Sequence, residues 1–136
     1  MRLTLTLLAT GAVSAIAALP AHAHHSFAAE FDANKDVDLT GIVTKIEWMN
    51  PHTIFYIDVE GEDGRYENWA IELGSPNGLM RRGWTRNSLK VGDSVSIAGS
   101  QARDGSPKAN ARTVMLADGK RMFAGTSQPD VEGSEQ

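Results

Sequence analysis

The feature that most constrains the fold is a run of alternating apolar residues whose phase changes at a glycine. Apolar side chains lie at odd positions before Gly41 and at even positions after it: Val37, Leu39, Ile42, Ile46 and Trp48. Alternation with a period of two is typical of a β-strand with one buried face. A change of phase at a glycine indicates a bulge or a sharp bend. The sequence therefore predicts a long first strand that bends at Gly41.

The same alternation, together with turn residues, predicts four further strands: 55–59, 69–73, 94–99 and 111–116. Ser75 followed by Pro76 predicts the start of a short helix, and Gly83 predicts its end. The polar stretch 100–108 is predicted to be a loop. Asp118-Gly119 predicts a turn that leads the chain back after the fifth strand.

Three strands, a short helical connection and two more strands, with the first strand long and bent, is the order of an OB-fold, a small five-stranded barrel. An open β-sandwich of the same strands is the competing arrangement. The barrel is favoured because a bent first strand can pair on both sides of a closed sheet. We expect an all-β protein with one short helix and a five-stranded OB-fold-like barrel. Ligands of OB-folds lie on strands two and three and on the loops after strands one and four, here 50–52 and 103–106.

The first residues have the pattern of a secretory signal peptide. Arg2 supplies the positive start, residues 3–19 form a mostly apolar run, and Ala21-His22-Ala23 is a small-x-small cleavage site. An uncleaved membrane anchor is the alternative, but the run is short for a span of roughly 20 apolar residues and lacks a charged stop. We therefore expect an exported, periplasmic protein without a transmembrane segment after cleavage. The predicted organisation is a signal peptide at 1–23, an OB-fold-like domain at 24–123 and a disordered tail at 124–136.

Charge limits the partners of such a chain. With 136 residues, 41% of them hydrophobic, the sequence fits one small domain. The formal net charge is −4, and the one basic cluster is Arg81, Arg82 and Arg86. Nucleic-acid binding requires more extensive clustering of Lys and Arg, so we expect no nucleic-acid partner.

Signals for catalysis are absent from the sequence. No cysteine is present, which excludes disulfides, iron–sulfur clusters and cysteine nucleophiles. Nucleophile-elbow, phosphate-loop and His-Glu-x-x-His motifs are missing. Asp32-x-Asn34-x-Asp36 opens like a calcium loop, but the sixth position is Val37 and the twelfth is Val43, where a glycine and an acid are required. We interpret the acidic stretch as a polar turn before the first strand, and we expect no enzyme.

Three of the four histidines lie beside the predicted cleavage site. Cleavage after Ala23 makes His24 the N-terminal residue, which offers a metal both its α-amine and its ring nitrogen. A second imidazole, from His25 or His52, completes a nitrogen set that suits Cu(II), because Cu(II) prefers tetragonal nitrogen ligation. Met49, in the same turn as His52, adds a soft ligand for Cu(I). The pattern predicts a copper site formed by His24, His25, His52 and Met49.

Two alternatives stand beside this site. A cut after Ala21 starts the chain at His22-Ala23-His24, which also chelates Cu(II) strongly through amine and backbone nitrogens. Without a metal, the histidines are a polar, solvated start of the mature chain, and His52 holds its turn by a hydrogen bond to the backbone. Copper is the one cofactor that the sequence suggests.

Aromatic and basic residues suggest a different function. If Trp48 and Tyr56 face outward from the first hairpin, they form a stacking platform for a planar or sugar-like ligand. Arg81 and Arg82 can pair with acidic groups of a protein partner, although a solvated helix face is the ordinary explanation. The alternative function is therefore a metal-free module that binds an envelope protein or a small ligand on the barrel face. The other two tryptophans are expected in the core and at one barrel mouth: Trp69 and Trp84.

Several short segments carry a family resemblance: 24–32 (HHSFAAEFD), 47–52 (EWMNPH), 68–69, 74–77, 83–85 and 110–112. Together they resemble a family of exported bacterial proteins described as a domain of unknown function. The resemblance covers essentially the whole mature chain and implies export and a single-domain architecture, without an established reaction. In layout alone, the chain is also similar to exported bacterial OB-fold proteins and to periplasmic haem chaperones, but it has no haem-attachment motif.

Overall fold

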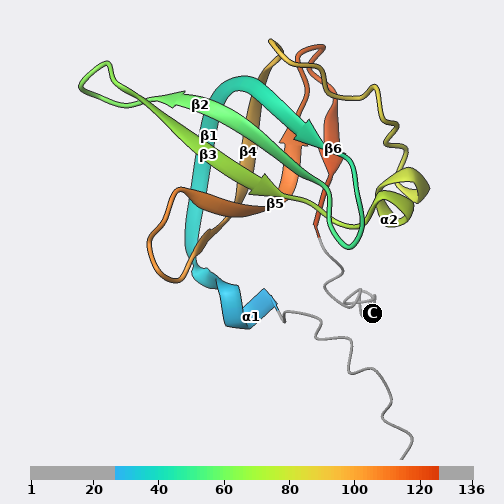
Figure 1. The fold of residues 1–136 in the computed structure, drawn as a ribbon, viewed down its shortest axis with the longest axis horizontal. Coiled ribbons are helices and arrows are strands. Elements are labelled where there is room, and N and C mark those ends of the chain that lie inside the picture. The colour runs from blue at the N-terminus through green and yellow to red at the C-terminus, as the bar shows by residue number, and fades with distance from the viewer. Residues whose placement is uncertain (1–26, 126–136) are drawn as a thin grey trace, which may run out of the picture.

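The computed structural model describes residues 27–125. The predicted signal peptide, His24 and His25, and all of the predicted tail except Ala124 and Gly125 lie outside the described residues. The elements in chain order are α1 (Phe27–Glu30), β1 (Phe31–Glu47), β2 (Ile54–Glu60), β3 (Tyr66–Glu72), α2 (Pro76–Arg81), β4 (Ser94–Ala102), β5 (Lys108–Met115) and β6 (Arg121–Phe123) (Figure 1).

The strands form one sheet that closes on itself. Their order is β3-β2-β1-β4-β5-β6, and a parallel pairing between β3 and β5 joins the two sides. The long β1 pairs with β4 along most of its length and with β2 near its end, and Ile42 is in register with both Asp58 and Ser94. This ring-like pairing confirms the predicted all-β, barrel-like fold. The added element is β6, a short sixth strand along β5.

Gly41 lies where β1 passes from one partner to the other. A Cβ atom at this position would lie 2.5 Å from the backbone oxygen of Asp58, so β2 approaches too closely for any side chain. The register of β1 against β2 shifts between Val43 and Lys45. The predicted irregularity is therefore present, but it begins two residues beyond the glycine. Val43 is 1% exposed, whereas Ile42, which the alternation predicted to face inward, is 43% exposed.

Two predicted loops are strands. Asp32, Asn34 and Asp36 lie within β1 rather than in a turn before it. This part of β1 keeps one feature of a turn, since the Asn34 N–H donates to Asp32 Oδ1 at 3.0 Å. Its pairing with β4 is irregular between Phe31 and Asp36. The predicted loop 100–108 is shorter than expected because β4 extends to Ala102 and β5 begins at Lys108. The polar composition of these segments predicted loops. They are strands because their backbones pair with neighbouring strands.

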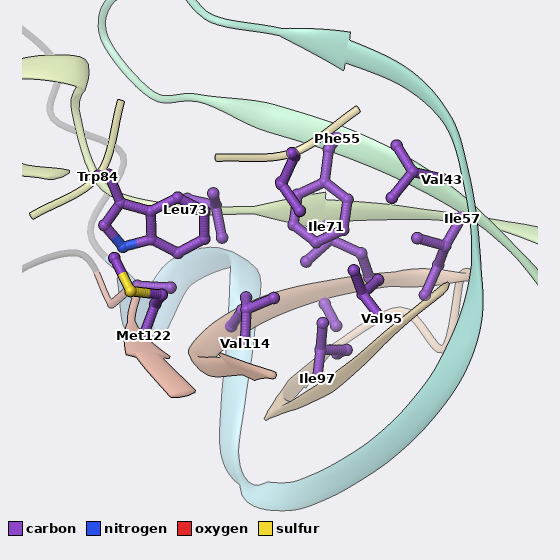
Figure 2. Packing of buried hydrophobic residues seen from close by; sticks show 14 of the residues in the cluster. Val43, Phe55, Ile57, Ile71, Leu73, Trp84, Val95, Ile97, Val114 and Met122 are labelled. Carbon is purple, nitrogen blue, oxygen red and sulfur yellow. The ribbon is translucent and has the colours of Figure 1, made fainter. Parts of the chain in front are cut away.

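The interior is filled by side chains from all sides of the ring (Figure 2). Trp69 is buried, as predicted. Trp84, which was predicted at one barrel mouth, is 2% exposed and belongs to the same buried cluster, and its Nε1 donates to the Phe123 oxygen at 2.8 Å. Ser75 caps α2 by accepting from the Gly78 N–H at 3.2 Å, as its sequence predicts. Ala124 is fully buried, and its N–H donates to the Arg112 oxygen at 2.9 Å. The packed domain therefore includes Ala124, which the sequence assigned to the tail.

Within residues 27–125, no helix has the length and apolar character needed to cross a membrane.

Candidate functional site

A cluster of polar and charged side chains lies where β3 meets β5. The parallel register places Glu72 beside Asn110 and Ala70 beside Lys108. Glu72 and Asn110 are among the few buried polar residues, with 7% and 3% of their surface exposed. His52, from the segment between β1 and β2, reaches Glu72, and Glu30 of α1 forms an ion pair with Lys108. We call Glu30, His52, Glu72, Lys108 and Asn110 the polar cluster.

Glu72 lies at the centre of the polar cluster. Its Oε1 lies 3.1 Å from His52 Nδ1 and accepts from Asn110 Nδ2 at 3.4 Å, and its Oε2 lies 3.8 Å from Lys108 Nζ. Burial raises the pKa of the Glu72 carboxyl above its ordinary value of 4.5, while His52 and Lys108 act in the opposite direction. Three polar neighbours thus replace part of the hydration that the Glu72 carboxylate loses on burial.

Lys108 connects this carboxylate to the beginning of the domain. Its Nζ also forms an ion pair with Glu30 Oε1 and lies 5.5 Å from the centre of the Phe31 ring. Phe31 itself is 1% exposed, and its ring centre is 5.6 Å from that of Phe27. The start of the described chain is therefore anchored on the β3–β5 junction by one ion pair and by aromatic packing.

His52 reaches the cluster because its segment extends the pairing of β2 with β3. The Thr53 N–H donates to the Gly74 oxygen at 3.0 Å, and the Leu73 N–H donates to the Thr53 oxygen at 2.8 Å. The turn before it contains a cis peptide bond between Asn50 and Pro51. A histidine whose Nδ1 is held by a carboxylate has a fixed ring orientation and presents Nε2 outward, which is the arrangement that metal-binding histidines commonly have.

The remaining predicted copper ligand and the predicted stacking residues are arranged differently. Met49 is 55% exposed. Trp48 is half-buried against the core, so its ring is not the open platform that the sequence suggested. Tyr56 points outward, and its hydroxyl donates to Glu47 Oε2 at 3.1 Å. Trp48 and Tyr56 therefore do not form two open faces for one planar ligand.

Tyr56 is instead part of a small surface network. Lys45 Nζ lies 2.5 Å from Glu47 Oε1 and 5.2 Å from the centre of the Tyr56 ring. Hydrogen bonds from Lys45 and Tyr56 lower the pKa of the Glu47 carboxyl, and burial, with Glu47, raises the pKa of the Tyr56 hydroxyl. The network holds Tyr56 against its own sheet.

Arg81 and Arg82 are exposed at the end of α2. Arg82 Nη1 donates to the Gly125 oxygen at 2.9 Å, so this arginine links α2 to the chain after β6. Neither arginine contacts Trp48 or Tyr56 in any interaction found among residues 27–125.

Sequence reasoning missed most of the polar cluster. Glu72 alternates with Ile71 and Leu73, a pattern that predicts a solvated face, and Lys108 was assigned to a loop. Glu72 is buried where β5 pairs with β3 and where His52, Lys108 and Asn110 surround its carboxylate, and the local sequence carries no signal for these long-range contacts. Within the described part of the chain, no three His, Cys, Asp or Glu side chains gather as a metal-binding group.

The model of a family described as a family of unknown function (DUF6152) matches residues 12–111 of the chain. The chain belongs to this family. The matched region includes every member of the polar cluster, whereas β6 follows it. The predicted membership of a family of unknown function is thereby confirmed at that level, and export remains a prediction. The search of curated proteins returned no match.

Proposed function

We propose that the protein is an exported, non-enzymatic binding protein that holds Cu(II) between its processed N-terminus and His52. The observation that carries this proposal is the 3.1 Å contact between His52 Nδ1 and Glu72 Oε1. A carboxylate that holds one ring nitrogen of a histidine fixes the orientation of the ring and leaves the second nitrogen for a metal.

The N-terminal donors can come from His24 after cleavage behind Ala23. Its α-amine and ring nitrogen supply two of the nitrogens that Cu(II) favours, and His25 or His52 supplies another. Phe27 is three residues after His24, so His24 can lie up to roughly 10 Å from the start of α1 in an extended chain. Since α1 is tied through Glu30 to Lys108, and Lys108 to Glu72, this reach supports a shared site with His52.

Met49 extends the proposal to reduced copper. Its thioether is exposed and three residues from His52, and thioethers prefer Cu(I) to Cu(II). The proposed site would therefore favour nitrogen ligands for Cu(II) and add one sulfur ligand for Cu(I).

The test is a Cu(II) titration of protein exported and processed by a bacterial host, with the N-terminus identified by mass spectrometry. A second version carries an extra N-terminal methionine, which removes the amine of His24 from the chelate. We expect tight one-to-one binding by the processed protein and its loss in the extended version.

A His52→Gln variant tests the tertiary part of the site. It should bind Cu(II) more weakly than the processed wild type, while Asn87→Gln, on an exposed turn, should bind equally. Weak and equal binding by all versions would rule out copper as the ligand.

A metal-free interaction module is the second candidate function. The observation in its favour is the exposed arginine pair of α2, rather than the aromatic pair that the sequence suggested. Replacing Arg81 should impair such a module and leave Cu(II) binding unchanged, and replacing His24 should have the opposite effect.

A further inference from the structure

Positive charge gathers at one end of this acidic protein. Residues 76–92, which form α2 and its connection to β4, and residues 119–125, which contain β6, together carry six lysines and arginines and no Asp or Glu. We call these two segments the basic end. The six cations are Arg81, Arg82, Arg86, Lys90, Lys120 and Arg121.

The two segments of the basic end are in contact. Trp84 Nε1 donates to the Phe123 oxygen at 2.8 Å, and Arg82 Nη1 donates to the Gly125 oxygen at 2.9 Å. In Figure 1, α2, the connection that follows it and β6 lie on the same side of the ring. The two segments therefore form one region, although 26 residues separate them in the sequence.

These cations are not neutralised by neighbouring carboxylates. Within residues 27–125, none of the six takes part in an ion pair, whereas Lys45, Arg65, Lys108 and Arg112 all do. The two flanking carboxylates serve the turns: Asp93 accepts from the Lys90 N–H at 3.0 Å, and Asp118 accepts from the Lys120 N–H at 2.9 Å. The basic end therefore presents its positive charge to the solvent.

Large apolar side chains also protrude from the basic end. Of the six large hydrophobic residues exposed in the described chain, three belong to it: Met80 at 50%, Val91 at 67% and Phe123 at 68%. Exposed apolar side chains among lysines and arginines are the combination that binds peripheral proteins to anionic membranes.

The opposite charge lies at the other side of the molecule. Residues 58–67, around the turn between β2 and β3, contain five acidic residues and one arginine, and Arg65 is paired with Asp63 at 2.6 Å. Figure 1 shows this hairpin extending away from α2. A molecule with this charge separation is oriented by an anionic surface so that the basic end approaches first.

We propose that the basic end is a docking surface for the headgroups of an anionic phospholipid membrane. The cations contact the phosphates, and Met80, Val91 and Phe123 enter the headgroup region. The polar cluster is not part of this surface, so the inference does not depend on copper binding.

The probe is a suspension of vesicles made of phosphatidylglycerol and phosphatidylcholine, compared with vesicles of phosphatidylcholine alone. The full chain is mixed with each at low salt, and the fraction that sediments with the vesicles is measured. We expect binding to the anionic vesicles alone, weakening as salt is added.

Two double variants with the same change in net charge identify the surface. Arg81→Gln with Arg121→Gln should weaken binding to anionic vesicles by about thirtyfold, the product of the contributions of two basic residues near a membrane. Lys35→Gln with Arg65→Gln, outside the basic end, should leave binding almost unchanged. Both double variants have the same N-terminus, so the difference between them does not depend on where the signal peptide is cleaved.

Phe123→Ser adds a test of the apolar contribution, and it should reduce the binding that persists at high salt. The proposal is overturned by equal binding to both vesicle types, by no binding to either, or by equal losses in the two double variants. Stronger binding to soluble polyglutamate than to the anionic vesicles would identify an acidic polypeptide as the partner instead. Sedimentation without vesicles would identify a second copy of the chain, joined through the acidic hairpin.

Discussion

His52 and Glu72 lie side by side, with Nδ1 of the histidine 3.1 Å from Oε1 of the carboxylate. The contact joins the turn after β1 to the end of β3. Lys108 and Asn110 of β5 contact the same carboxylate. A strand position that alternation predicts to face solvent is therefore the centre of a buried polar cluster. Several measurable consequences depend on this pair and on the fold that forms it.

Replacing Glu72 with glutamine should lower the affinity of the processed protein for Cu(II) by about 10–100-fold, the usual cost of losing a carboxylate that orients a metal-binding histidine. The amide keeps the size of the side chain but not its charge. Titration of wild type, Glu72→Gln and the exposed control Glu60→Gln provides the measurement. Equal affinities in all three would show that Glu72 does not support the site.

The metal-free protein should lose stability as pH rises above about 4.5 because of Glu72. Its pKa in the folded protein is raised by burial above the ordinary 4.5, so the folded state binds this proton more tightly than the unfolded state does. The free energy of unfolding therefore decreases with rising pH until the raised pKa is passed. The charged groups that face Glu72 are His52, Lys108 and Glu30.

Urea unfolding of wild type and Glu72→Gln across a pH series isolates this effect. The stability of the wild type relative to the variant should fall over that window. A constant difference, or one that grows with pH, would contradict the prediction.

A Gly41→Ala substitution should destabilise the fold by about 1–3 kcal/mol, because its Cβ would lie 2.5 Å from the Asp58 oxygen. The matched control is Gly125→Ala, whose Cβ would lie 3.9 Å from its nearest neighbour, the Ala111 oxygen, which is an ordinary contact distance. The urea midpoints of the two variants provide the comparison. Similar midpoints would mean that β1 and β2 separate easily at Gly41.

Trp84→Ala should lower the free energy of unfolding by about 3–5 kcal/mol. The indole is 2% exposed and also donates to the Phe123 oxygen, so the substitution leaves a cavity and removes a contact between the α2 connection and β6. Trp48→Ala, at a half-buried ring, should cost clearly less. Thermal unfolding followed by circular dichroism ranks the two variants, and the reverse order would contradict the packing described above.

The sequence by itself determined the central parts of five strands and the short helix, but not β6 or the ends of β1, β4 and β5. Alternation at Val95 and Ile97 and the cap at Ser75 are local signals, since each depends on residues a few positions away. Gly41 marked an irregular strand in the sequence, but the close approach of Asp58 to it is visible only in the structure. The ring-like pairing was also predicted, because a long bent strand can pair with a different neighbour on each side, as β1 does with β2 and β4.

Tertiary structure alone decided the polar cluster and the basic end. Glu72 is buried because β5, 38 residues later at Asn110, pairs with β3 in parallel, and because Glu30 and Lys108 meet across 78 residues. The cations of α2 join those of β6 in the same way, through the contacts of Trp84 and Arg82. Alternation reports which side of a strand faces the core, but whether the other side meets water or another segment depends on long-range pairing that no local pattern encodes.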